Sequence, residues 1–401
     1  MAWCSALAGC ILLVTTGVHG KDSQSKWAAK CRDMVMHNVP TKRLQMLTNG
    51  INVSRWFNAK PDEAREIPSD ATLKRLRVDG FSHIRLPVAA ERLLKPFGNP
   101  DRADAMLNEL KDAIDRLVRF GFVVSIDLHP GARFRAVHKS TNSVPYRAGN
   151  YLVDIWAKLA RKLKKTSPDE VLFELLNEPA VDQVTWHRQA GELIKTIRAI
   201  APLHTLIYGT ANQQQVYMLK GLKPFKDRNV VYAVHFYDPF VFTHQGVHWI
   251  QDAEWLKKIH DLPFPMTSAD GRPFDETSRQ GIRLKASLDR MGPEAAAKVK
   301  HSMREGAHNA ARINTSFSKL ALWADKCQRP VIVNEFGAFR RNVSAKKLAV
   351  LSVAERAAFD AREKSSRQSR KNWLRAVRAA ADKHRIGLAR WELTKGFGLQ
   401  N

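Results

Sequence analysis

Eight short apolar runs, each separated from the next by a longer amphipathic segment, constrain the fold of this sequence more than any other feature. The runs are rich in β-branched residues and have the length of strands. They span residues 50–56, 83–88, 122–129, 171–177, 206–210, 230–236, 330–335 and 387–391. Strands that alternate with helices form parallel βαβ units, because a parallel connection needs a long crossover.

The segments between the runs have helical periodicity, and the clearest of them span residues 103–120, 151–165, 186–201 and 371–384. No glycine-rich nucleotide-binding fingerprint follows any of the runs. The sequence therefore predicts an α/β fold, a single-domain (β/α)8 TIM barrel, rather than a doubly wound sheet.

Two departures from a plain barrel are expected. A segment from residue 238 to about 316 follows the sixth strand and is too long for a simple loop, so we expect short helices within it. Only ten residues follow Trp391, which leaves no room for a normal eighth helix. We expect either that residues 27–39 cover the gap in the barrel wall or that the barrel is truncated.

The composition excludes some broad classes of protein. Hydrophobic residues make up 44% and charged residues 26% of the 401 residues, so a mainly disordered chain is excluded. A polytopic membrane protein is excluded as well, because only one long apolar run stands out. The net charge of +26 suits acidic partners such as polyanionic glycans, anionic lipid surfaces or nucleic acid.

The sequence pattern at the N-terminus indicates that the protein is exported. Residues 6–18 form an apolar stretch that is too short to span a bilayer and ends in small residues, as in a signal peptide. A buried N-terminal helix and lipoprotein cleavage at Cys10 remain as alternatives. We expect a signal peptide over 1–20, an N-terminal segment over 21–45, the barrel over 46–401, and a secreted or periplasmic protein.

Two cysteines, Cys31 and Cys327, would remain after removal of residues 1–20. An oxidising compartment would permit them to form a disulfide, but two distant cysteines are also consistent with free thiols. No C-x-x-C pattern occurs, so a zinc ribbon or a redox motif is not supported.

Two carboxylates follow strand runs. The fourth run ends in Asn177-Glu178-Pro179, and the seventh contains Asn334-Glu335 and is followed by Gly337. Pro179 biases Glu178 towards an extended backbone, and catalytic residues of barrels lie at the carboxyl ends of strands. The fourth and seventh strands face each other across the barrel, so Glu178 and Glu335 provide the carboxylate pair that glycoside hydrolysis needs.

These motifs resemble those of a known family. Residues 175–179 (LLNEP) and 333–337 (VNEFG) are similar to the acid/base and nucleophile motifs of glycoside hydrolase family 5, the cellulase family. Matching residues at other strand ends are Arg85, His129, His235, Tyr237 and Trp391. The resemblance covers residues 50–399.

The resemblance implies a secreted retaining endo-β-glucanase with Glu335 as nucleophile and Glu178 as acid/base. Glu335 must be ionised, and Glu178 needs a raised pKa. The expected substrate-binding residues are Arg85, His129, Asn177, His235, Tyr237 and Trp391, with Trp56 as a weaker stacking candidate. No metal or other cofactor is expected. The linkage and the sugar stay open among cellulose, mixed-linkage, β-1,3 and β-1,6 glucans and mannan.

Two other classes of function compete with this reading. A catalytically silent glycan-binding protein could use the same fold, although both carboxylates are present. A cationic protein could bind anionic polymers through the basic runs at 161–165, 340–341 and 367–378, but these runs fall mostly on helices and favour a solvated outer face. No specific nucleic-acid motif is found. We expect a monomer that acts on a polysaccharide and has no transmembrane anchor.

Overall fold

The structure is a computed structural model, and it describes residues 31, 35–60, 63–93, 100–140, 147–250, 253–341 and 348–399. The signal peptide predicted over residues 1–20 lies outside the described residues, as does residue 27, where the expected cover of the barrel wall begins. Among the residues described, no helix is long and apolar enough to cross a membrane.

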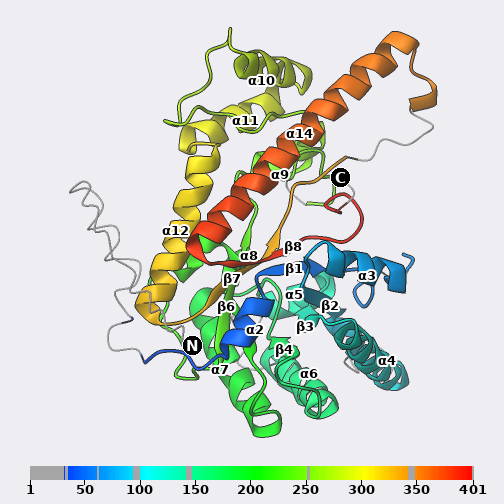
Figure 1. The fold of residues 1–401 in the computed structure, drawn as a ribbon, viewed down its shortest axis with the longest axis vertical. Helices are drawn as coiled ribbons and strands as arrows, with labels where there is room; N and C mark the ends of the chain where they lie inside the picture. The colour runs from blue at the N-terminus through cyan, green and yellow to red at the C-terminus, as the bar shows by residue number, and fades with distance from the viewer. Residues whose placement is uncertain are drawn as a thin grey trace, which may run out of the picture.

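Eight parallel strands close into a barrel, with helices around it (Figure 1). Each strand pairs with the next one in the sequence, and β1 also pairs with β8. The predicted TIM barrel is therefore confirmed. The strands are β1 (Asn49–Asn52), β2 (His83–Ala89), β3 (Val123–His129), β4 (Val171–Glu174), β5 (Leu206–Gly209), β6 (Val230–Phe236), β7 (Val331–Phe336) and β8 (Gly387–Arg390).

Helices connect the strands and form the outer wall of the barrel (Figure 1). The longer ones are α3 (Asp70–Val78), α4 (Pro100–Arg119), α5 (Ala132–Ser140), α6 (Arg147–Leu163), α7 (Gln183–Ile200), α10 (Arg279–Arg290), α11 (Pro293–Glu305), α12 (Ala310–Cys327) and α14 (Val353–His384). The short ones are α2 (Thr41–Met46), η2 (Ala90–Leu93), α8 (Ala211–Gln214), η3 (Val216–Leu219), α9 (Phe240–Thr243) and η4 (Glu254–Lys258).

The inside of the barrel has an apolar floor. Inward side chains from five strands belong to one buried cluster: Val123, Leu172, Ile207, Val231, Ala233 and Ile332. Val39 and Leu47 belong to the same cluster, and Leu44 and Met46 pack against it, so α2 and its flanks close the lower end. Burial of this apolar surface stabilises the barrel and leaves polar side chains to the opposite, carboxyl-terminal end of the strands.

The long segment after β6 contains helices of its own, as expected: α9, η4, α10, α11 and the start of α12. Another helix is longer than predicted. α14 begins at Val353, well before residue 371, because Ser352 and Glu355 form a capping box at its start. Its N-terminal half projects beyond the barrel, to the upper right in Figure 1. At the middle of the helix, Arg283 of α10 donates a hydrogen bond to Ser369 of α14 at 3.0 Å.

No helix follows β8 within the described residues, which run to residue 399. The expectation that residues 27–39 cover this gap is not met by their described part. The amides of His37 and Asn38 donate to the carbonyls of Gln328 and Arg228, at the lower end of β6 and β7. The outside of β1 and β8 instead borders an open groove, lined by Asn49, Phe81, Phe336, Leu374, Arg375, Arg378, Ala379, Asp382 and Arg390.

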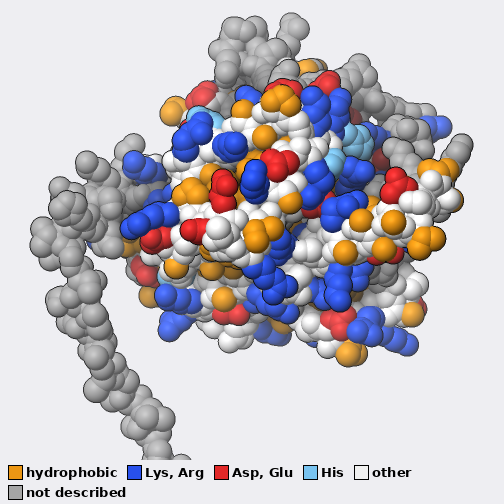
Figure 2. Space-filling view, turned by 90° about the horizontal axis from the view of Figure 1, so that it is seen from above, with side chains coloured by type: hydrophobic (Ala, Val, Ile, Leu, Met, Phe, Trp, Pro, Cys, Tyr) orange, Lys and Arg blue, Asp and Glu red, His pale blue; other side chains and the backbone are white. Residues whose placement is uncertain are grey.

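Positive charge is distributed widely over the surface. On the face shown in Figure 2, lysine and arginine side chains are spread over the whole surface, with fewer acidic side chains among them. Several members of the two basic runs are exposed, including Arg161, Lys164, Lys165 and Arg367. These runs lie on or directly after helices α6 and α14, as predicted for a solvated outer face.

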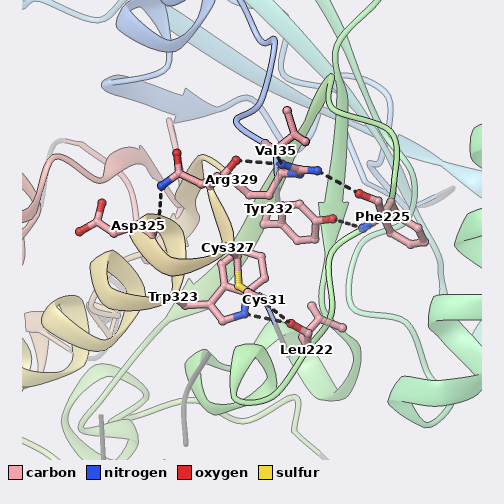
Figure 3. Close-up of a disulfide and its surroundings, with 10 residues drawn as sticks. Cys31, Val35, Leu222, Phe225, Tyr232, Trp323, Asp325, Cys327 and Arg329 are labelled. Atoms are coloured by element: carbon pink, nitrogen blue, oxygen red, sulfur yellow. Dashed lines mark hydrogen bonds between the residues drawn. A yellow bond between two sulfur atoms is a disulfide. The ribbon is translucent and has the colours of Figure 1, made fainter. Parts of the chain in front are cut away.

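Cys31 and Cys327 form a disulfide, which settles the alternative that the sequence left open (Figure 3). The bond joins residues 296 positions apart and ties the N-terminal segment to the end of α12. It is buried beside Trp323, whose indole nitrogen donates to the Leu222 carbonyl at 3.2 Å. Arg329 reinforces this junction by donating to the Val35 carbonyl at 2.7 Å.

Candidate active site

Arg85 of β2 is fully buried at the carboxyl end of the barrel and organises the polar residues there. Its guanidinium binds Glu174 of β4 through two hydrogen bonds, at 2.7 and 2.8 Å, and donates to Glu335 of β7 at 2.6 Å. It also forms an ion pair with Asp127 of β3. One arginine thus holds carboxylates from three other strands, and burial raises the pKa of Glu174 against the opposing effect of Arg85.

Glu335 lies among hydrogen-bond donors. Besides Arg85, the Tyr237 hydroxyl donates to its carboxylate at 3.1 Å, and Nδ1 of His235 lies 3.5 Å away. The side chain is 7% exposed, so one edge of the carboxylate can still be reached from the cleft. Burial, followed by the negative charges of Glu335 and Glu178, raises the pKa of Tyr237 well above its ordinary value, which keeps this hydroxyl protonated and able to donate.

Glu178 follows β4 and has a left-handed backbone, with φ of +45°. The expectation of an extended backbone before Pro179 is therefore wrong. The amide of Glu178 donates to the side-chain oxygen of Gln214 at 2.8 Å, which helps to hold this conformation. Gly209 makes room for Gln214, because a Cβ at residue 209 would lie 2.5 Å from the Gln214 side chain.

The electrostatics of Glu178 also differ from the expectation. Burial raises the pKa of Glu178, but the hydrogen bond from His235 at 3.2 Å and the charges of His235 and Arg135 together lower it to about 2. Arg135 of α5 lies 3.3 Å from the carboxylate and donates to the Glu178 carbonyl at 2.9 Å. The raised pKa expected for a general acid is not found, because His235 and Arg135 stabilise the ionised carboxylate.

His129, Asn177 and Trp391 lie together on one side of the carboxylates. The His129 ring stacks on the Trp391 indole with centroids 5.7 Å apart, and Asn177 Nδ2 lies 3.4 Å from His129 Nε2. The Asn177 side-chain oxygen accepts from Arg85 at 2.8 Å. Asn177 is thus held by protein partners at both ends of its amide, whereas Trp391 and His129 line the open cleft.

A cleft of about 610 Å³ brings together seven of the residues predicted from the sequence: His129, Asn177, Glu178, His235, Tyr237, Glu335 and Trp391. Arg85 lies beneath it and touches its floor through Glu335 and Asn177. The long segment after β6 supplies Phe240, His244 and Trp249 to the wall. Flat aromatic faces beside paired carboxylates suit a pyranose ring, which has apolar faces and polar edges.

The weaker candidate, Trp56, is not part of the cleft. Its side chain is buried, and Arg116 lies 5.8 Å from the centre of its ring. Sequence reasoning placed it on the first strand, but β1 ends at Asn52. Trp56 therefore packs in the core and is not available to stack on a sugar.

Several residues of the site were missed in the sequence. Asp127 and Glu174 are charged residues inside apolar runs, and Asp127 lies two positions before His129, so the strand period of two could have identified its inward direction. Arg135 and Gln214 lie on helices and carry no such signal. Glu392 directly follows Trp391; it is buried and bonds the Ser54 hydroxyl.

One group of side chains has the composition of a metal site. Among the described residues, Glu178, His235 and Glu335 each offer a ligand atom, and the three atoms lie within 4.8 Å of one another. Carboxylate and imidazole are ligands for zinc and similar ions. The same three residues form the candidate catalytic centre, so a bound ion would compete with hydrolysis by a carboxylate pair.

Comparison with known proteins agrees with this geometry. The family described as cellulase (glycosyl hydrolase family 5) matches residues 37–395. Endoglucanase 3 of Fibrobacter succinogenes is 25% identical over 383 residues, which cover 91% of this chain and 52% of that protein. Endoglucanase C of Acetivibrio thermocellus is 28% identical over 211 residues, which cover 51% of this chain and 61% of that protein.

The chain thus spans about half the length of Endoglucanase 3 and about three fifths of Endoglucanase C. A solved structure with the same fold is that of endoglucanase Cel5A from the hyperthermophilic Thermotoga maritima. It has a TM-score of 0.63 and 23% identity, and the match covers 90% of this chain and 94% of that one.

The site predicts a pH dependence of stability through Glu392. Burial, with Glu335 and Glu66 nearby, raises the pKa of Glu392 from 4.5 to about 7. Between these pH values the unfolded chain releases the proton while the folded chain keeps it, so the free energy of unfolding should fall as pH rises, by roughly 3 kcal/mol in all. Glu392→Gln should remove this loss, so the variant should gain stability relative to wild type between pH 4.5 and 8.

Urea unfolding of wild type and Glu392→Gln at several pH values tests this. Glu276→Gln, which changes an exposed carboxylate, is the control and should show no pH-dependent difference from wild type. A stability difference between Glu392→Gln and wild type that stays constant from pH 4.5 to 8 would contradict the assignment.

Proposed function

The chain belongs to glycosyl hydrolase family 5, the cellulase family, and from this premise we propose that it is a secreted endo-β-glucanase that retains the anomeric configuration. One observation carries the proposal. Glu178 after β4 and Glu335 of β7 face the same cleft, with an oxygen of each within 4.8 Å of the other. Such a short gap is typical of retaining enzymes, whereas inverting enzymes leave room for a water.

In the first step Glu335 attacks the anomeric carbon and forms a covalent glycosyl-enzyme. A carboxylate nucleophile must be ionised, and the Arg85 guanidinium at 2.6 Å supports the charged form. The Tyr237 hydroxyl at 3.1 Å orients the same carboxylate. Because both donors are fixed by the barrel, the attacking oxygen is held in place before the substrate arrives.

Glu178 protonates the leaving oxygen in the same step. Burial raises the pKa of Glu178, but the hydrogen bond from His235, whose Nδ1 lies 3.2 Å from Glu178, and the charges of His235 and Arg135 lower it to about 2. We infer that a sugar over this carboxylate excludes water and disfavours its charged form, so that Glu178 can carry the proton that it gives to the leaving oxygen.

In the second step a water attacks the glycosyl-enzyme, and Glu178, now ionised, accepts its proton. His235 and Arg135 stabilise Glu178 in this ionised form, which suits its role as base. Trp391 and His129 present a stacked pair of rings to one face of the cleft, where they would hold a glucose unit. The proposed substrate class is β-glucan, with the linkage and the sugar still open.

The first functional prediction concerns the two carboxylates. Glu335→Ala should abolish release of reducing sugar from a panel of β-glycans, and Glu178→Ala should lower it by about 10²–10⁴-fold, the usual contribution of a general acid. Aryl glycosides with activated leaving groups need no proton, so Glu178→Ala should form the glycosyl-enzyme from them at nearly the wild-type rate. Glu276→Ala, an exposed carboxylate, is the control.

Normal activity of Glu178→Ala on a natural glucan would contradict the assignment of Glu178 as the acid/base. A wild-type protein that binds the glycans of the panel and releases no reducing sugar from any of them would favour the silent glycan-binding alternative.

The stereochemistry of the product gives a second test. With a nucleophile and an acid/base this close, two successive inversions should return the β configuration of the substrate. Proton NMR during early hydrolysis of a soluble β-glucan should show the β-anomer first, before mutarotation. An α-anomer that appears first would disprove the double displacement while leaving the fold and the family unaffected.

Export is the third part of the proposal. The Cys31–Cys327 disulfide supports it, because such bonds persist in oxidising compartments. Intact mass spectrometry of exported protein should give the mass of residues 21–401 less two hydrogens. An intact Met1, a lipid on Cys10, or two free thiols in the exported protein would contradict it.

A further inference from the structure

A second pocket, of about 390 Å³, lies between the segment that follows β6 and the N-terminal half of α14. Six basic side chains line it, from η4 and the residues that follow it, α10, the chain after β7, and α14: Lys258, His260, Arg290, Arg341, Arg362 and Arg370. Only two carboxylates, Asp261 and Glu363, are part of its lining. The pocket and the cleft share no lining residue.

The two carboxylates are each shared between arginines. Asp261 lies 3.7 Å from both Arg290 and Arg362. Glu363 contacts Arg370 at 3.0 Å and Arg340 at 3.3 Å. Lys258 has a partner of its own outside the lining, Glu294 at 3.3 Å. Because each carboxylate neutralises one unit of charge, the four arginines of the lining exceed its two carboxylates and leave an excess of positive charge.

Two of the arginines, Arg370 and Arg341, have hydrogen-bonding capacity that no carboxylate fully uses. Arg370 lies at the pocket's buried end and is 5% exposed, and its Nε has no hydrogen-bond acceptor in the part of the chain that the structure describes. Arg341 Nη1 lies 2.6 Å from Nε2 of His260. Burial, and then the charges of Arg341 and Arg290, lower the pKa of His260 to about 4. His260 is therefore neutral near pH 7, so the charge of Arg341 is not balanced by this neighbour.

The pocket is partly exposed to solvent and lies next to the cleft. Arg290, Arg362 and Lys258 at its mouth are about half exposed. The pocket adjoins the cleft, since Phe339 of the pocket packs on Phe397 of the cleft with ring centroids 5.4 Å apart.

We propose that this pocket is an oxyanion-binding site that takes the carboxylate of a uronate unit in an acidic polysaccharide. Guanidinium groups bind planar carboxylates through paired hydrogen bonds, and several of them converge here with too few acidic partners. The net charge of +26 would draw such a polymer to the surface. The choice of a sugar acid over a free phosphate rests on the proposed function, whereas the oxyanion site does not.

The test compares two variants on one helix. Arg362→Gln removes a pocket residue that is 41% exposed and lies 3.7 Å from an aspartate. Arg356→Gln is the matched control on α14, 47% exposed and 3.2 Å from Asp360, and it does not line the pocket. Isothermal titration calorimetry at low ionic strength would measure the binding of trigalacturonate and, separately, of inorganic phosphate.

We expect Arg362→Gln to weaken trigalacturonate binding about tenfold, as for the loss of a charge-assisted contact, and Arg356→Gln to leave it within about twofold. A repeat with saturating cellotriose, which would occupy the cleft, separates the two sites, because uronate binding should persist. This readout needs no turnover, so it can fail or succeed independently of the proposed hydrolysis.

Equal weakening by both variants would mean that surface charge alone attracts the anion, and would overturn the site. Absence of binding by either anion would overturn it as well. Binding of phosphate without trigalacturonate would overturn the assignment to a sugar acid, and displacement by cellotriose would place the uronate in the cleft instead.

Discussion

The buried guanidinium of Arg85 is the interaction on which the rest of the site depends. It holds Asp127, Glu174 and Glu335 from three other strands at the carboxyl end of the barrel. Without it, three carboxylates would lie close together in a region of low dielectric, which costs several kcal/mol per uncompensated charge. Closure of the barrel and formation of the site are therefore linked, because the strands that carry these carboxylates surround one cation.

The same arrangement gives the two candidate catalytic carboxylates different surroundings. Glu335 is held by Arg85 and the Tyr237 hydroxyl and is almost buried. Glu178 is a quarter exposed and contacts Arg135 and His235, of which His235 also lies 3.5 Å from Glu335. Different surroundings allow two chemically identical groups to take different roles.

The segment after β6 contributes to two separate sites. The segment after β6 supplies an aromatic wall to the cleft through Phe240 and Trp249. Its other side meets the long helix α14 and forms the basic pocket beside Phe339. The excess of basic residues in this chain is thus partly concentrated in a defined pocket as well as spread over the solvated helices.

The sequence by itself determined the barrel, the strand-end placement of Glu178 and Glu335, and the aromatic residue after β8. Strand periodicity and motif position are local properties, and they can be read along the chain. Only the tertiary structure decided which side chains meet Arg85, since its partner Glu335 is 250 positions away. It also decided the left-handed backbone of Glu178, because that conformation is supported by Gln214 from the next βα unit. A period of two sets the face on which a side chain lies, but its partners are set by closure of the barrel.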